Sequence, residues 1–161
     1  MVERQLYLYE YVVAPFEEVV RVVRDEGARV FESATEEAVS GAERVQADLV
    51  VDLGGFEVGR EVEISVGELI EVQSMCVKTH LDWHASELSA LFPSLSADLE
   101  IAALATGDNP LTQVTMVGHY DPPLGVLGAL GDAVFGHRLA EAALHRFLNT
   151  TVDRLSDAAR G

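Results

Sequence analysis

The segment Gly118-His119-Tyr120-Asp121-Pro122-Pro123-Leu124-Gly125 is the part of this sequence from which a fold can be predicted most directly. It ends a run of alternating apolar and polar residues, and its two adjacent prolines stop strand pairing because proline has no backbone N–H to donate. After Gly125 an apolar pattern with helical spacing continues to Leu155, which predicts one helix over about 126–155. A helix of about 30 residues spans roughly 45 Å, so we expect it to lie across a large sheet.

An alternation of period two predicts that sheet upstream of the prolines. Residues 2–13 read as a first strand rich in aromatic and β-branched side chains, and alternating runs follow near 45–53, 58–66, 77–85, 95–103 and 114–120. Between the first strand and residue 44, helical spacing predicts two short helices, over about 15–25 and 28–40, that end at Gly27 and Gly41. The predicted fold class is α+β: a single domain over 1–161 in which a curved antiparallel sheet of six or seven strands surrounds a long C-terminal helix.

Composition excludes several classes of partner. The 161 residues contain 11 Lys plus Arg against 27 Asp plus Glu, a formal net charge of -16. Nucleic acids and anionic membranes are bound mainly through clustered basic residues, so we expect neither as a partner. Cys76 is the only cysteine, which indicates a reducing, cytoplasmic compartment. No apolar run reaches 18 residues, so we expect no membrane insertion.

One polar row is a candidate for metal binding or acid–base chemistry. His80, Asp82 and His84 alternate along one predicted strand and therefore project from the same face. The intervening Leu81 and Trp83 belong to the core face, however, so we predict that the polar row faces water and that its imidazoles titrate near the usual value of about 6.5. We assign no metal site, cofactor or catalytic residue. The full predicted outer row is Lys78, His80, Asp82 and His84.

Three stretches carry a resemblance to a known family. They are Ala14-Pro15-Phe16-Glu17-Glu18-Val19, Leu91-Phe92-Pro93 and the stretch from Gly118 to Gly125. Together with the order of elements, they resemble the START-like or SRPBCC superfamily, the helix-grip fold of birch-pollen-allergen-like proteins, polyketide cyclases and lipid-transfer domains, and in particular an uncharacterised bacterial branch. The resemblance implies a cavity for a hydrophobic or amphipathic small molecule, in proteins that mostly carry, transport or sense ligands and in a minority catalyse.

We therefore predict a cavity of roughly 300 to 1,000 Å³ between the sheet and the C-terminal helix. Small residues on the inner faces, among them Ala97, Ala103, Gly118 and Ala133, are expected to leave the room. Ordinary core packing of the large residues, and a surface position for the histidine, remain open. The predicted ligand-binding residues are Ile64, Leu81, Trp83, Leu99, Met116, Tyr120, Val134 and His137.

Two other functions remain open beside binding of a hydrophobic small molecule. One is an enzyme of the cyclase or dehydratase type, with an inward His or Tyr as general acid or base. The other is a protein-interaction module, and a homodimer is also left open. Titratable side chains that converge inside the cavity would favour the enzyme, and the sequence offers few of them, so we favour binding.

Overall fold

The computed structural model describes residues 3–53, 62–85, 93–122 and 133–161. The side chains of 42–53, 85 and 133–136 are not described, although their backbone is. The elements in chain order are β1 (Arg4–Val12), α1 (Phe16–Leu53), β2 (Val62–Val66), β3 (Ile70–Gln73), β4 (Cys76–Ala85), β5 (Ser94–Ala105), β6 (Leu111–Asp121) and α3 (Ala133–Arg160).

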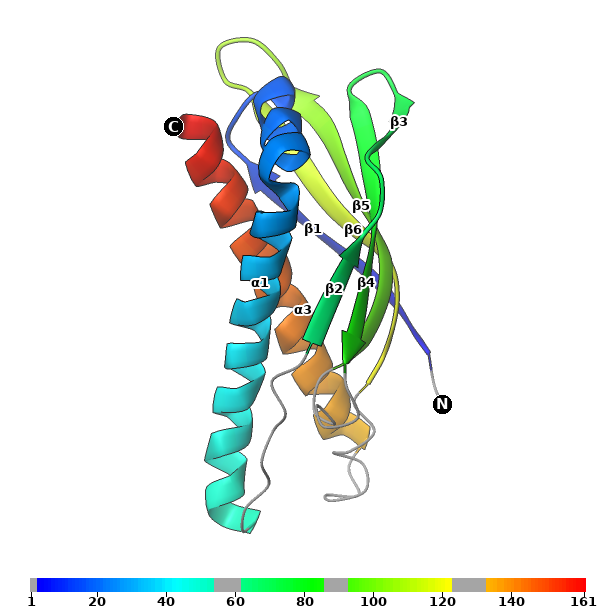
Figure 1. Ribbon diagram of the computed structural model, residues 1–161, viewed down its shortest axis with the longest axis vertical. Helices are drawn as coiled ribbons and strands as arrows, with labels where there is room; N and C mark the ends of the chain where they lie inside the picture. Colours follow the sequence, from blue (N-terminus) through cyan, green and yellow to red (C-terminus); the bar gives the residue numbers. More distant parts are fainter. Residues whose placement is uncertain (1–2, 54–61, 86–92, 123–132) are drawn as a thin grey trace.

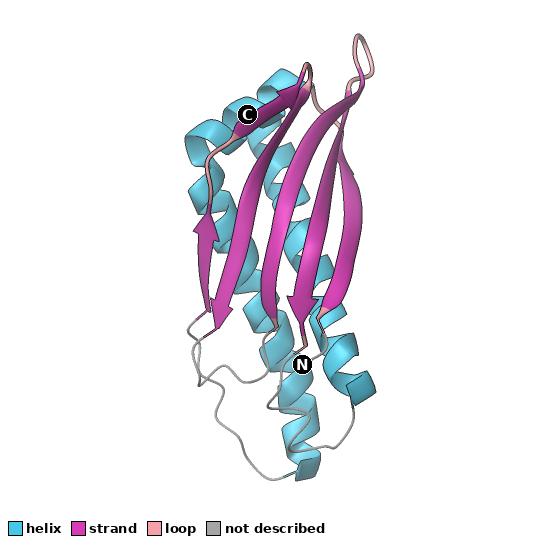
Figure 2. Cartoon of the chain, turned by 90° about the vertical axis from the view of Figure 1, so that its right-hand side faces the viewer, coloured by secondary structure: helices cyan, strands magenta, loops and turns pink. Residues whose placement is uncertain are grey.

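The strands form a six-stranded antiparallel sheet, which confirms the predicted fold class. The strand order is β1-β6-β5-β4-β2, and β3 also pairs with β4. Both helices lie behind one face of the curved sheet (Figure 2). A first strand, a helix, a run of antiparallel strands and a C-terminal helix are the arrangement of a helix-grip fold.

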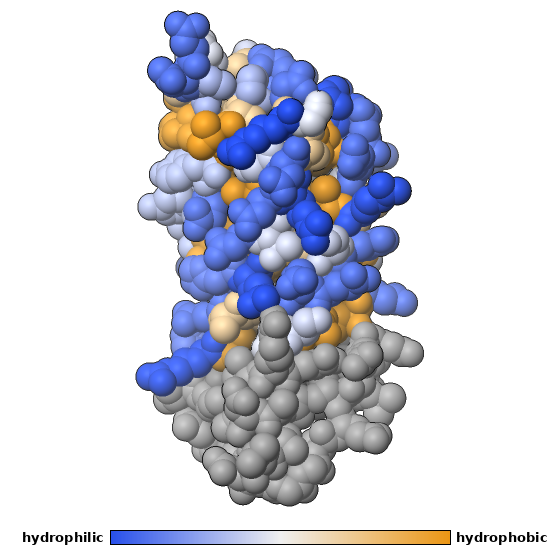
Figure 3. Space-filling view, turned by 90° about the vertical axis from the view of Figure 1, so that its left-hand side faces the viewer, coloured by the Kyte–Doolittle hydropathy of each residue, from blue (hydrophilic) through white to orange (hydrophobic). Residues whose placement is uncertain are grey.

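The two helices pack against each other as well as against the sheet. They run in opposite directions, so that the start of α1 lies beside the end of α3 (Figure 1). An ion pair at 3.2 Å joins Arg146 of α3 to Glu37 of α1. The described residues on the helix side form a mostly hydrophilic surface (Figure 3), so the apolar faces of the helices are directed inward.

The core is centred where the helices meet the sheet. Phe147 of α3 makes an edge-on contact with Trp83 of β4, with ring centroids 5.0 Å apart, and stacks with Phe31 of α1 at 6.4 Å. The indole Nε1 of Trp83 donates a hydrogen bond to the hydroxyl of Thr35 on α1 at 3.2 Å. All these side chains are buried, as is the thiol-bearing Cys76 at the start of β4.

The segment after β1 differs from the prediction. Instead of two short helices over 15–25 and 28–40 and a strand over 45–53, one helix of 38 residues runs from Phe16 to Leu53. Neither Gly27 nor Gly41, the two predicted helix ends, ends this helix. A Cβ at Gly27 would make only ordinary contacts with Phe31 and Val23, whereas a Cβ at Gly41 would lie 2.8 Å from Cδ of Arg146. The side chain of Arg146 on α3 thus passes close to Gly41 on α1, and a sequence-based stop signal cannot distinguish a glycine of this kind from a helix end.

One further strand and one helix boundary also differ from the prediction. β3 was not predicted, and it forms a short exposed strand that turns through Met75, whose φ is +61°, into β4. The C-terminal helix ends at Arg160 instead of Leu155, and the predicted start at 126 lies outside the described residues. Leu91 and Phe92 of the quoted motifs also lie outside them.

Candidate functional site

Two hollows between the helices and the sheet are lined by residues that the structure describes. The first, which we call the β1–α3 pocket, measures about 430 Å³ and lies between residues 3–8 at the start of β1 and the first half of α3. Apolar walls come from Leu6, Leu8 and Leu144. Polar groups from three elements meet in the same space: Arg4, Tyr120, His137, Glu141 and His145.

A chain of hydrogen bonds crosses the β1–α3 pocket. The hydroxyl of Tyr120 on β6 lies 2.8 Å from Nδ1 of His137, and Nε2 of His137 lies 3.1 Å from Oε1 of Glu141. A carboxylate only accepts, so Nε2 carries the proton, and the neutral imidazole then accepts the phenol O–H at Nδ1. The two rings also stack, 9° from parallel with centroids 6.2 Å apart.

The secondary structure positions each member of this chain. His137 and Glu141 are four residues apart on α3 and therefore adjacent on its surface. Tyr120 lies on the face of β6 that is directed toward the helices, and it is directly opposite Arg4 of β1. Burial raises the pKa of Tyr120, the negative charge of Glu141 raises it further, and the guanidinium of Arg4 opposes both. The phenol therefore stays protonated at neutral pH and serves as a hydrogen-bond donor.

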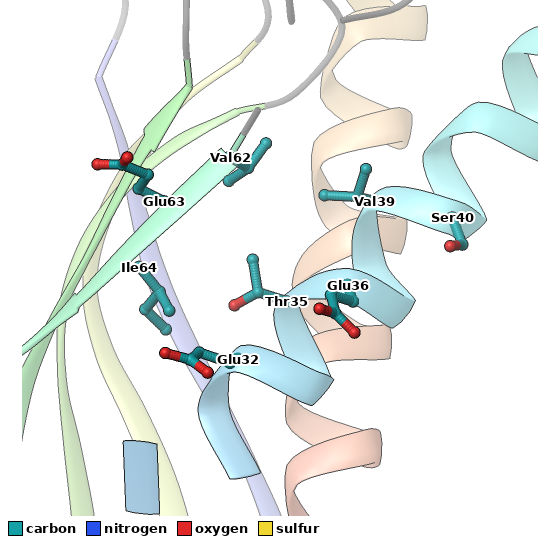
Figure 4. Close-up of a pocket in the computed structure, with 8 residues that line it drawn as sticks. All are labelled: Glu32, Thr35, Glu36, Val39, Ser40, Val62, Glu63 and Ile64. Atoms are coloured by element: carbon teal, nitrogen blue, oxygen red, sulfur yellow. The ribbon is translucent and has the colours of Figure 1, made fainter. Parts of the chain in front are cut away.

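The second hollow, which we call the α1–β2 groove, measures about 790 Å³ and is shown in Figure 4. Val62 and Ile64 project from β2 toward Thr35 and Val39 of α1. Three carboxylates also line the groove: Glu32, Glu36 and Glu63. The described residues that line this hollow belong to the edge strand β2 and the first helix, and none of them to the C-terminal helix.

The structure divides the predicted ligand-binding residues among three places. Tyr120 and His137 line the β1–α3 pocket, and Ile64 lines the α1–β2 groove. Val134 belongs to α3, but its side chain lies outside what the structure describes. The other four are fully buried in the shared core: Leu81, Trp83, Leu99 and Met116. A ligand contact for any of the eight stays a prediction.

The small residues of the inner face do not all leave room. A Cβ at Gly118 would overlap the carbonyl oxygen of Ser96 and would lie 2.5 Å from Cα and 2.7 Å from Cβ of Ala97 on β5. Gly118 therefore permits close approach of β6 to β5 instead of opening a space beside them. Ala103 is half-buried, and the side chain of Ala133 is outside the described set.

Of the described residues that line the β1–α3 pocket, sequence reasoning predicted only Tyr120 and His137 as ligand-binding. Leu6 and Leu8 were predicted only as part of the first strand, and Glu141 was not among the predicted ligand-binding residues. The i, i+4 spacing of His137 and Glu141 was a signal that favoured their pairing. Nothing in the sequence indicated that β1 would lie beside β6, which brings Arg4 opposite Tyr120.

The polar row on β4 lies on the outer face, as predicted. His80 and His84 are exposed, whereas Leu81 and Trp83 between them are buried. The expectation of ordinary titration is wrong for His80. Its Nδ1 lies 2.8 Å from Asp98 of β5, and this hydrogen bond, with a smaller contribution from Asp82, raises the pKa of His80. In the described part of the chain, no group of three His, Cys, Asp or Glu side chains is arranged to hold a metal ion.

Comparisons with known proteins add little to this geometry. No protein-family model matches the chain, and no curated protein matches its sequence. Solved structures similar to it include the protein TTHA0849 from Thermus thermophilus, with 13% identity, a TM-score of 0.41 and coverage of 96% of this chain and 99% of that one. The Zhui aromatase/cyclase from Streptomyces sp. R1128 is 14% identical, with a TM-score of 0.36 and coverage of 96% and 94%.

A third similar structure is an uncharacterized protein from Rhizobium leguminosarum, with 13% identity, a TM-score of 0.39 and coverage of 95% and 96%. Likenesses at this level carry no argument about function. None of the described helices is both long and apolar enough to cross a membrane. The case for a function therefore rests on the two hollows.

Proposed function

We propose that this protein binds a hydrophobic or amphipathic small molecule in the β1–α3 pocket, between the sheet and the C-terminal helix. The observation that carries the proposal is a buried phenol, hydrogen-bonded to His137, which is in turn paired with Glu141, beside walls formed by Leu6, Leu8 and Leu144. Apolar walls supply affinity in proportion to the ligand area they bury, and a few fixed polar groups supply orientation.

The polar groups favour a particular kind of ligand. The guanidinium of Arg4 donates hydrogen bonds at neutral pH, and the oxygen of Tyr120 can accept one while its proton is held by His137. A ligand with a carbonyl, hydroxyl or acidic head and an apolar body meets both requirements. The proposal includes a cytoplasmic location and membership of the START-like superfamily, and the net charge of -16 disfavours nucleic acid as a partner.

Binding of the fluorescent probe 1-anilinonaphthalene-8-sulfonate tests the proposal, because the probe has an apolar body and an anionic head. We expect Leu8→Trp, which places a larger side chain in the β1–α3 pocket, to raise the Kd of the probe at least tenfold. The matched control is Ile64→Trp, which makes the same kind of change in the α1–β2 groove and should leave the Kd within about twofold. Absence of probe binding to the wild type, or the opposite pattern in the two variants, would contradict the proposal.

A second candidate function is favoured by the hydrogen-bond chain itself. If a ligand presents an acidic C–H bond to Tyr120, the phenol oxygen can take that proton while its own proton passes to Nδ1 of His137. The carboxylate of Glu141 then stabilises the imidazolium. The electron pair of the broken C–H bond stays on the ligand as an enolate, so the step is general base catalysis without any cofactor.

Exchange of the α-protons of 2-tetralone in D₂O, followed by NMR, tests this second function. We expect the wild type to accelerate exchange over buffer at least tenfold, and Tyr120→Phe to return it to the buffer rate. Retained probe binding by Tyr120→Phe would show that the pocket is still formed. Exchange at the buffer rate with the wild type would remove the enzymatic candidate and leave the binding proposal intact.

A further inference from the structure

The β1 strand lies at an outer edge of the sheet. Among the strands that the structure describes, β1 pairs only with β6, through all nine residues from Arg4 to Val12. Half of its backbone N–H and C=O groups therefore point away from the sheet with no strand to receive them. Such an edge is a template for pairing with another strand.

The outer face of this edge strand is also unusually aromatic. Tyr7, Tyr9 and Tyr11 are 64%, 49% and 43% exposed and contact one another edge-on, with centroids 6.1 and 5.8 Å apart. Val117 of the neighbouring β6, which is opposite Tyr7, extends the exposed apolar surface. Sheet edges that stay unpaired usually carry charges, prolines or bulges, and this one carries a row of aromatic rings.

The two charges of β1 select the partner. Arg4 and Glu10 are the only charged residues in the strand, and neither forms an ion pair with another described residue. They stand six residues apart, about 20 Å at the rise of a strand, so they cannot pair within one chain. Both have the same parity and point to the same face of the sheet.

We propose that β1 pairs with β1 of a second copy of this chain, antiparallel about a two-fold axis at Tyr7. In this register Arg4 of each copy lies directly opposite Glu10 of the other, and Leu6 lies opposite Leu8. The tyrosines of the two copies form one continuous row on the outer face. A two-fold axis makes the interface self-complementary, and opposite charges facing each other across antiparallel strands favour this register over its neighbours.

This inference goes beyond ligand binding and does not depend on it. Residues 3–8 of β1 line the β1–α3 pocket, so the second strand would lie along one side of the pocket. Dimerisation and probe binding are measured separately, so failure of either leaves the other to be judged by its own experiment.

The dimer is tested by sedimentation velocity of the full chain over micromolar concentrations. The variants reverse one charge of the proposed pair or exchange both. Arg4→Glu and Glu10→Arg each replace two attractive pairs with two repulsive ones, so we expect each to weaken the dimer at least tenfold. The double variant Arg4→Glu/Glu10→Arg restores both pairs across the interface and should recover the wild-type dimer. The control Arg24→Glu changes the same charge on an exposed position of α1 and should have no effect.

A wild type that stays monomeric throughout this range would overturn the proposal. So would a dimer that neither single variant weakens, or a double variant that fails to recover, because only facing strands in this register make the two changes compensate. Circular dichroism of each variant checks that the substitutions at the exposed Arg4 and the half-buried Glu10 leave the chain folded.

Discussion

At the residue scale, the exposed pair of His80 and Asp98 makes a small part of the stability dependent on pH. The hydrogen bond with Asp98 raises the pKa of His80, and the same bond lowers the pKa of Asp98. The contribution of His80 is therefore complete below its unfolded pKa of about 6.5 and is lost as the pH rises through its higher folded value. The contribution of Asp98 is complete above about 3.9 and is lost as the pH falls through its lower folded value.

The pair should consequently stabilise the fold most between about pH 4 and 6.5. The two side chains are 49% and 42% exposed, so solvent limits the contribution to about 0.5 kcal/mol or less. We predict that Asp98→Asn lowers the pKa of His80 toward the usual histidine value, as measured by NMR titration of the imidazole. The control Glu100→Gln, two residues further along β5, should leave it unchanged, and a pKa insensitive to Asp98 would show that the hydrogen bond is not formed.

The same residues show how far sequence can predict a site. Alternation placed His80 outside and Trp83 inside correctly, because parity depends only on the local pattern. The partner of His80 depends on which residue of β5 lies opposite, and no local pattern contains that register. Tyr120 and His137 were likewise predicted to line a cavity, but their direct hydrogen bond depends on the packing of α3 against β1, the strand that pairs with β6.

At the element scale, β5 and β6 are held close together at Gly118. A Cβ there would overlap the carbonyl of Ser96 and the backbone of Ala97, neither of which can move without shifting a strand. We predict that Gly118→Ala lowers the free energy of unfolding by about 1–3 kcal/mol, measured by urea denaturation. The control Gly27→Ala lies within α1, where a Cβ meets only ordinary contacts, and should be neutral or stabilising by up to about 1 kcal/mol. Equal effects at both sites would contradict the close approach.

The first helix shows why an element can be misjudged by its local pattern. Val45, Leu49 and Leu53 fit an alternating strand, but their spacing of four residues fits a helix equally well. The glycine signal that favoured a helix end at Gly41 has a tertiary cause, the passage of Arg146 across it. Since that cause lies about 100 residues away along the chain, propensity and periodicity had no access to it.

At the scale of the whole molecule, one aromatic cluster joins both helices to the sheet. Phe147 contacts Trp83 of β4 and Phe31 of α1 and is itself fully buried. We predict that Phe147→Ala lowers the free energy of unfolding by about 3–5 kcal/mol, whereas Phe147→Leu, which keeps much of the volume, should cost clearly less. Urea transitions followed by helical circular dichroism and by fluorescence of Trp83 should coincide in the wild type, because the elements share one core. Separate transitions would show that the helices unfold independently.

The buried Cys76 makes this molecule convenient for site-specific labelling. Its thiol is the only one in the sequence, and burial, together with the negative charge of Glu100, raises its pKa, so little reactive thiolate is present at neutral pH. A single cysteine introduced at an exposed turn position such as Ser74 would therefore carry a dye or spin label alone, without prior removal of a native thiol. Distances between labels on two copies would then report directly on their relative arrangement.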